Sequence, residues 1–410
     1  MRRFTVITLA AALAGLLPTQ DLAAQRGQKA KDAWKLDPYT EGKDEALEKA
    51  GYVSLGPFIW GDDHDTLQIE HVLGDQVKLL WVETAHFRIG STLPPYKIPR
   101  EKTERTKLKK ELLRLKKKLP KIKTSAKELD RWTRLHLFAQ RLEETYQQIS
   151  ELLGVTTDDF PKTRGERVND RYMGEGPYLG QQEKYTVLLF EKKTTCGHYL
   201  RNFLKMDHAS AMRHNFVRTG SLLYVTSTEF AEETLKIDTA LHCEAAFNAV
   251  HSLLDGYRYY WHNMPHWFRQ GLAHCYLRDI SPKYNVYNEA TRYDNQPEKL
   301  WNWPPRVHAR AKFDHFPRAE EILQWADTDE KKLTDSMMLW SRVDYLRSLG
   351  DDGLRDYIHQ MSEPFGGTTQ PTAAQIHERQ LSVMKDVWDL EPASYDAAWR
   401  KWVLRNYPKN

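Results

Sequence analysis

Cysteine is scarce in this sequence, with three in 410 residues, which excludes a disulfide-dense scaffold. An excess of one charge sign is also missing: 60 Lys and Arg stand against 56 Asp and Glu, a formal net charge of +4. No global field therefore steers the chain toward nucleic acid. After the first 24 residues no apolar run is long enough to cross a bilayer. What the chain does have is 40% hydrophobic residues and 13 Trp, which suits the core of an ordered globular protein.

The N-terminal segment has the parts of a secretory signal peptide. Two arginines open the chain, residues 4–17 form an apolar run, and small residues lead to a cleavage position after Ala24. The run is short for a membrane span, and no stop-transfer pattern follows it. We therefore expect residues 1–24 to be a signal peptide and the mature protein to be exported, periplasmic or extracellular, without a transmembrane helix. Retention of the segment as an uncleaved anchor is the alternative.

Changes in composition divide the remaining chain into three parts. Residues 25–74 are predicted to form an N-terminal tail and lead-in, and residues 75–280 a domain of strands followed by a pair of helices. Inside that domain, residues 100–153 are predicted to form a helical hairpin. Residues 281–410 are expected to be a helical subdomain, irregular over 284–316 at its start. Strands that precede helices in this way indicate the α+β class.

The strands are predicted from short runs of β-branched and aromatic residues. Residues 77–82 and 86–90 are expected to form a strand pair, and residues 184–190 and 216–226 two further strands.

The hairpin combines an apolar stripe with a strong basic charge. Residues 100–123 are rich in Lys and Arg, and leucines recur among them at helical spacing. Ser125 is predicted to cap the second helix and Gly154 to end it. A solvated face is the favoured interpretation of the basic residues. The alternative is a surface that contacts an anionic partner, as in a structural envelope protein.

Two segments of the helical region resemble a known active site. Residues 240–254 read ALHCEAAFNAVHSLL and residues 265–273 read PHWFRQGLA, while residues 81–89 read WVETAHFRI. Together they resemble the helix pair and the opening strand of the peptidase MA-like (gluzincin) zinc metallopeptidases, over about residues 75–405. The resemblance implies a zincin-like domain with a small mixed sheet, an active-site helix pair and a helical C-terminal half.

Zinc chemistry explains the residue types that this family requires. Two His at positions i and i+4 face the same side of a helix and bind one Zn²⁺. A Glu beside the first His accepts a proton from the zinc-bound water, and a Glu on the second helix is the third ligand. On this chain the matching positions hold Phe247, Asn248, His251 and Gln270. Only the histidine matches, so the resemblance implies a degenerate site and a non-catalytic pseudopeptidase that binds peptide or protein in the former cleft.

Other interpretations of these helices remain open. His251, Asp255, His266 and His274 are weak candidates for a relocated site, which would make the protein a zinc metallopeptidase with non-standard ligands. The histidines are equally compatible with capping or hydrogen bonding within the helix pair, with no cofactor bound. In zincins the strand matching residues 221–225 borders the cleft, and its edge pairs with extended peptide.

A disulfide is implied by the same resemblance. The two helices are antiparallel in the family, which brings Cys243 near Cys275 and predicts a bond between them, with Cys196 left free. Three buried thiols are the alternative.

Overall fold

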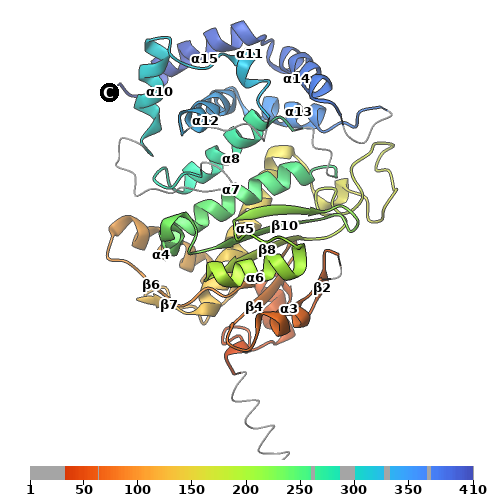
Figure 1. The fold of residues 1–410 in the computed structure, drawn as a ribbon, viewed down its shortest axis with the longest axis vertical. Coiled ribbons are helices and arrows are strands. Elements are labelled where there is room, and N and C mark those ends of the chain that lie inside the picture. The colour runs from red at the N-terminus through yellow and green to blue at the C-terminus, as the bar shows by residue number, and fades with distance from the viewer. Residues whose placement is uncertain are drawn as a thin grey trace, which may run out of the picture.

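The structure is a computed structural model that describes residues 33–62, 64–259, 264–286, 301–326, 333–366 and 371–409. A mixed sheet lies in one half of the molecule and a group of helices in the other, with α7 and α8 between them (Figure 1). The chain is therefore α+β, as predicted. The expected signal segment, residues 1–24, lies outside the described residues. Among the described helices, none combines the length and apolar character needed to span a bilayer.

The main sheet has six strands in the order β1-β4-β5-β8-β10-β9. The neighbours β5, β8 and β10 are parallel, whereas the β1–β4, β4–β5 and β10–β9 pairs are antiparallel. The strands are β1 (Tyr52–Ser54), β4 (Leu80–Thr84), β5 (Phe87–Ser91), β8 (Tyr185–Phe190), β9 (Met212–Phe216) and β10 (Ser221–Ser227). The four strands predicted from the sequence are all present. β8 and β10 are buried along their whole length, as strands covered on both faces must be.

Helices cover both faces of this sheet. On one face, α5 (Arg131–Leu153) contacts β4 and β5, and α7 (Asp238–Gly256) contacts β10. The Tyr224 hydroxyl of β10 donates to the Glu244 carboxylate of α7, at 2.9 Å. On the other face, α3 (Thr66–Leu73) and α6 (Lys193–Leu204) enclose a smaller core that includes Trp60 and Phe216.

The predicted helical hairpin is present, with one boundary moved. Its first helix, α4 (Lys102–Lys118), buries leucines on one side and exposes most of its lysines. The second, α5, is capped by Asp130, whose carboxylate accepts from the Thr133 backbone N–H at 2.9 Å, and not by Ser125. An Asp cap satisfies a free N–H of the first turn. Gly154 ends α5 with φ 64°, as predicted, because glycine tolerates this left-handed conformation.

The segment predicted to be a tail and lead-in, residues 25–74, contributes a strand and core residues to the fold. β1 forms the edge of the main sheet beside β4, and Trp60, Ile69 and Leu73 are buried in the smaller core. The short elements here and nearby are η1 (Ala33–Lys35), α2 (Asp44–Ala50), β2 (Ile59–Trp60), β3 (His64–Asp65), β6 (Tyr96–Lys97), β7 (Glu128–Leu129), η2 (Thr157–Asp159) and η3 (Ala231–Lys236).

The C-terminal half is helical and packs on α8 (His266–Ile280), which pairs with both α7 and α12. Its elements are α10 (Trp303–Lys312), α11 (Ala319–Ile322), α12 (Leu333–Ser348), α13 (Asp351–Met361), α14 (Ala373–Trp388) and α15 (Pro392–Asn406). The expectation that residues 284–316 are irregular is wrong for α10. Two prolines follow Trp303, and proline is tolerated in the first turn of a helix.

Candidate functional site

The position that the resemblance assigns to the first zinc ligand is filled by an aromatic ring. Phe247 is 5% exposed, and its ring centroid lies 4.7 Å from that of His251 and 5.0 Å from that of His274. The Asn248 amide donates to the Glu244 backbone carbonyl at 3.0 Å, and Gln270 is half-buried on α8. Phenylalanine has no donor atom for zinc, so the matched positions do not fit the family's metal.

The residues weighed for a relocated metal site have other neighbours. The Asp255 carboxylate forms ion pairs with Arg213, at 3.1 Å, and with Arg269. His274 lies against Trp303 as well as Phe247, and burial together with the nearby Arg278 lowers its pKa to about 3.

His251 and His266 are both buried. Within the described ranges, no group of three or more His, Cys, Asp or Glu gathers as metal ligands would.

The expected disulfide is not formed in the structure. Cys196, Cys243 and Cys275 are all free and buried. The Cys243 thiol lies 3.7 Å from the Leu277 carbonyl oxygen, whereas Cys275 interacts with Arg347 of α12. The antiparallel helices do bring these ends together, but the two side chains face different neighbours. Burial raises the pKa of each of the three thiols to about 12.

The other matched residues of α8 have structural roles. The Trp267 indole N–H donates to the Gln380 side-chain oxygen at 2.9 Å, and both side chains are buried. A Cβ atom added at Gly271 would lie 2.4 Å from a Val343 methyl group and 2.6 Å from the Leu339 carbonyl oxygen. Trp267 therefore attaches α8 to α14, and Gly271 permits the close approach of α8 to α12.

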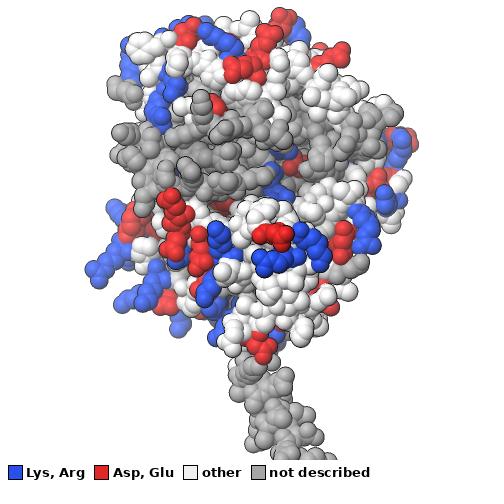
Figure 2. All heavy atoms as spheres, in the orientation of Figure 1, with Lys and Arg blue, Asp and Glu red and all other residues white. Residues whose placement is uncertain are grey.

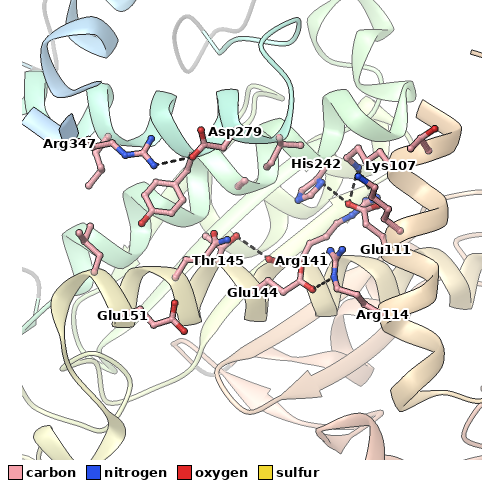
Figure 3. Close-up of a pocket in the computed structure, with 18 of the residues that line it drawn as sticks. Lys107, Glu111, Arg114, Arg141, Glu144, Thr145, Glu151, His242, Asp279 and Arg347 are labelled. Atoms are coloured by element: carbon pink, nitrogen blue, oxygen red, sulfur yellow. Dashed lines mark hydrogen bonds and ion pairs between the residues drawn. The ribbon is translucent and has the colours of Figure 1, made fainter. Parts of the chain in front are cut away.

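A large cleft lies beside this helix pair. It has a volume of about 860 Å³ and lies between the hairpin α4–α5 and the helices α7, α8, α12 and α13. Figure 3 shows Lys107 and His242 on one side of it and Glu151, Asp279 and Arg347 on the other. Phe247, His251 and Gln270 are not among its lining residues. The open space is therefore next to the predicted metal position and not at it.

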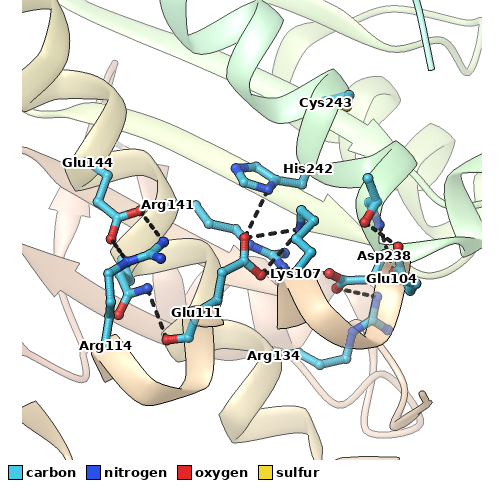
Figure 4. Close-up of polar contacts among 12 residues, drawn as sticks. Glu104, Lys107, Glu111, Arg114, Arg134, Arg141, Glu144, Asp238, His242 and Cys243 are labelled. Carbon is cyan, nitrogen blue, oxygen red and sulfur yellow. Dashed lines mark hydrogen bonds and ion pairs between the residues drawn. The ribbon is translucent and has the colours of Figure 1, made fainter. Parts of the chain in front are cut away.

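Buried charges on three helices form one side of the cleft. Arg141 of α5 contacts the Glu111 carboxylate of α4 at 2.6 Å and the Asp238 carboxylate of α7 at 2.5 Å (Figure 4). All three side chains are at most 5% exposed. The Lys107 ammonium lies 3.0 Å from Glu111, and the His242 ring nitrogen Nδ1 lies 3.4 Å from it. These five residues are named the Arg141 network below.

The electrostatics of this network follow from its burial. Burial alone would raise the pKa of Glu111 and of Asp238, but the positive charge of Arg141 outweighs it and lowers both. Burial, with the charges of Arg141 and Lys107, lowers the pKa of His242 to about 3. Both carboxyls are therefore ionised at neutral pH and the imidazole is neutral.

A third buried carboxyl, that of Glu104, lies beside the network. Burial raises the pKa of Glu104, whose carboxyl group accepts from the Thr239 hydroxyl. The Arg134 guanidinium lies 4.0 Å from Asp238. These contacts join the start of α7 to the hairpin.

Sequence reasoning did not find the cleft. Lys107, Glu111 and Arg114 are spaced by three or four residues, a pattern that indicates one face of a helix. Glu111 and Arg114 pair with Arg141 and Glu144, each 30 positions away on α5, and Arg141 contacts Asp238 a further 97 positions along the chain. Only the fold brings these residues together.

The strand expected to border a peptide cleft is not an edge. β10, which contains residues 221–225, pairs with β8 on one side and β9 on the other. Its backbone groups are therefore used within the sheet, and β9 is the outer strand. Comparisons with protein-family models, with curated proteins and with solved structures find no match to this chain.

Proposed function

We propose that this protein is an exported, non-catalytic member of the zincin-like class that binds a peptide segment in the cleft beside α7 and α8. One observation carries the proposal: the cleft is open, while the positions that would hold zinc and its base carry Phe247, Asn248 and Gln270. A protein with this arrangement retains space for a ligand but lacks the groups that activate water.

The charges around the cleft favour a ligand that carries both signs. Lys102 and Lys110 line one end and have no acidic partner within ion-pair distance among the described residues. At the other end, Glu151 and Asp351 line the cleft without a basic partner in the described part of the chain. An extended peptide with acidic residues toward the lysines and basic residues toward the carboxylates satisfies both ends.

The face drawn in Figure 2 shows no comparable separation of charge. On the face drawn in Figure 2, Lys and Arg are interspersed with Asp and Glu over both halves of the molecule. The small net charge agrees with this mixture. Because its unpaired charges are separated by sign, the cleft is a better place for selective binding than this outer face.

Two fluorescent octapeptides of the same composition test the proposal. One has its Asp residues in one half and its Lys residues in the other, and the second has them alternating. We expect the first to bind more tightly by about tenfold, and Lys110→Glu to remove that preference. Lys109→Glu is the matched control, because Lys109 is exposed on the same helix but does not line the cleft. Equal binding of the two peptides, or equal effects of the two variants, would overturn the proposal.

Metal analysis and a peptidase assay test the non-catalytic part separately. We expect no stoichiometric zinc after dialysis and no cleavage of a general peptide substrate. Tight uptake of one zinc per chain with hydrolysis would instead establish a metallopeptidase with non-standard ligands. Those ligands would be sought among His251, Asp255, His266 and His274.

A further inference from the structure

A histidine and a glutamate form a fixed pair on the far side of the hairpin from the cleft. The ring nitrogen Nδ1 of His86 lies 2.7 Å from the Glu143 carboxylate, and the His86 backbone N–H donates to the same carboxylate at 2.9 Å. The Thr84 hydroxyl also donates to Glu143. The His86 ring stacks on Tyr146, with centroids 3.7 Å apart and an angle of 14° between the planes. The imidazole is therefore held both at its edge and on its face.

This arrangement determines which nitrogen is available to a ligand. Burial would raise the pKa of Glu143, but the hydrogen bond and charge of His86 and the bond from Thr84 lower it, so the group is a carboxylate. The carboxylate accepts a hydrogen bond from Nδ1–H, which leaves Nε2 as the ring nitrogen available to a ligand. Among the described residues none hydrogen-bonds to Nε2.

The pair lines a second cavity of about 680 Å³. Lys117 and Lys118 of α4 line it too, and neither has an acidic partner within ion-pair distance among the residues that the structure describes. Apolar surface comes from Tyr146, Phe160 and Leu179. The cavity thus combines two unpaired positive charges, an oriented imidazole and an apolar wall.

We propose that this cavity is a binding site for an amphiphilic acid. The oxyanion of the ligand contacts Nε2 of His86 and the ammonium groups of Lys117 and Lys118, and its apolar part lies against Tyr146 and Phe160. An oxyanion only accepts hydrogen bonds, so it is the protonated imidazole that binds it: Nδ1–H donates to Glu143 and Nε2–H donates to the ligand. This site does not depend on peptide binding in the cleft.

Calorimetry with three probes of similar apolar size tests the site: 4-phenylbutyl phosphate, 4-phenylbutyrate and 4-phenylbutanol. We expect at least one acid to bind at about millimolar concentration or below, and the neutral alcohol to bind about tenfold more weakly or not at all. Whichever of the two acids binds more tightly identifies phosphate or carboxylate as the natural oxyanion. Equal binding of acids and alcohol, or no binding of either acid, would refute the proposal.

Variants separate the roles of the site from a general effect on folding. His86→Asn keeps an amide donor close to the position of Nδ1 but has no counterpart of Nε2, so it should retain the wild-type melting temperature and lose about tenfold in affinity for the acid. Lys117→Gln with Lys118→Gln should weaken binding similarly, whereas Lys109→Gln with Lys116→Gln, on exposed positions of the same helix outside this cavity, should not.

Full binding by His86→Asn would exclude the assigned role of Nε2. Loss of acid binding in Lys110→Glu, which lines only the other cavity, would show that the acid occupies the cleft.

Discussion

Replacing Arg141 with Met tests whether the buried network stabilises the joint between the hairpin and α7. The substitution keeps an unbranched side chain of similar length and removes the charge that contacts Glu111 and Asp238. Asp238 then keeps the charge of Lys107 and that of the more distant Arg134, at 4.0 Å, and Glu111 keeps Lys107, at 3.0 Å. Two carboxylates remain buried with reduced compensation.

The expected cost is large. Breaking a buried ion pair by removing one partner destabilises a protein by about 3–5 kcal/mol, because the remaining charge is not solvated. A value near the lower end is expected here, since Lys107 and Arg134 stay in place. The loss is still a substantial part of a typical folding free energy of about 5–15 kcal/mol. Arg114→Met is the matched control: its ion pair with Glu144 is 47% and 37% exposed, so about 0–1 kcal/mol is expected.

The pH dependence distinguishes charge from packing. In the wild type the lowered pKa values of Glu111 and Asp238 give stability that is present above the unfolded pKa and is lost as the pH falls through the folded pKa. In Arg141→Met the two carboxyls stay buried without the guanidinium, so their pKa values in the folded state rise above those in the unfolded chain. Stability therefore falls as the pH rises from the unfolded pKa to the folded pKa. Across the range from about pH 5 to 8 the difference in unfolding free energy should therefore grow.

Urea unfolding followed by circular dichroism at both ends of that range measures the difference. His242 also contributes over this range, because its folded pKa of about 3 lies below an unfolded value of about 6.5. Only the unfolded chain takes up this proton as the pH falls toward 5, which lowers stability there, so Arg141→Met is compared with its parent in a His242→Asn background. A difference that is the same at both pH values, or no larger than that of Arg114→Met, would show that Arg141 acts through packing alone.

Three further outcomes are expected. Gly271→Ala should destabilise the fold by about 1–3 kcal/mol in urea titrations, because the added Cβ overlaps α12. Gly366→Ala is the control and should change the unfolding free energy little, because its added atom meets nothing within 4 Å. Similar values for the two variants would contradict the close contact at Gly271. Phe247→His combined with Asn248→Glu and Gln270→Glu should bind one zinc per chain by elemental analysis, if these positions match the family's ligands; a folded variant without zinc would exclude that alignment. Titration of thiols in denaturant without reductant should find three free cysteines, and a count of one would restore the Cys243–Cys275 disulfide.

Most regular elements could be predicted because their signals are local. β8 is a continuous apolar run, and the boundaries of α4 and α7 follow the amphipathic and apolar patterns of their sequences. The start of α5 was predicted at Ser125, because its spacing to Glu128 imitates a capping box; Asp130 caps the helix instead. β9 was not predicted, because residues 212–216 are mostly polar and gain their strand conformation by pairing with β10.

The candidate sites were much less accessible from the sequence than the fold. The position of Phe247 on α7 next to His251 follows from helical spacing. The contact of Arg141 with Asp238 spans 97 positions and that of His86 with Glu143 spans 57. His86 was noticed only as part of the segment WVETAHFRI, and nothing local indicates its carboxylate partner. Contacts of this kind depend on how helices from separate parts of the chain pack.

Arg114 and Glu144 line both cavities, so a single solvent-facing pair of side chains forms part of the partition between them. Substitution of these two side chains removes this part of the partition without any movement of the backbone. Shortening both residues to alanine would remove this pair from between the two cavities at little cost in stability. Small changes at these two positions are therefore a direct evolutionary route by which the protein could accept longer ligands without altering its fold.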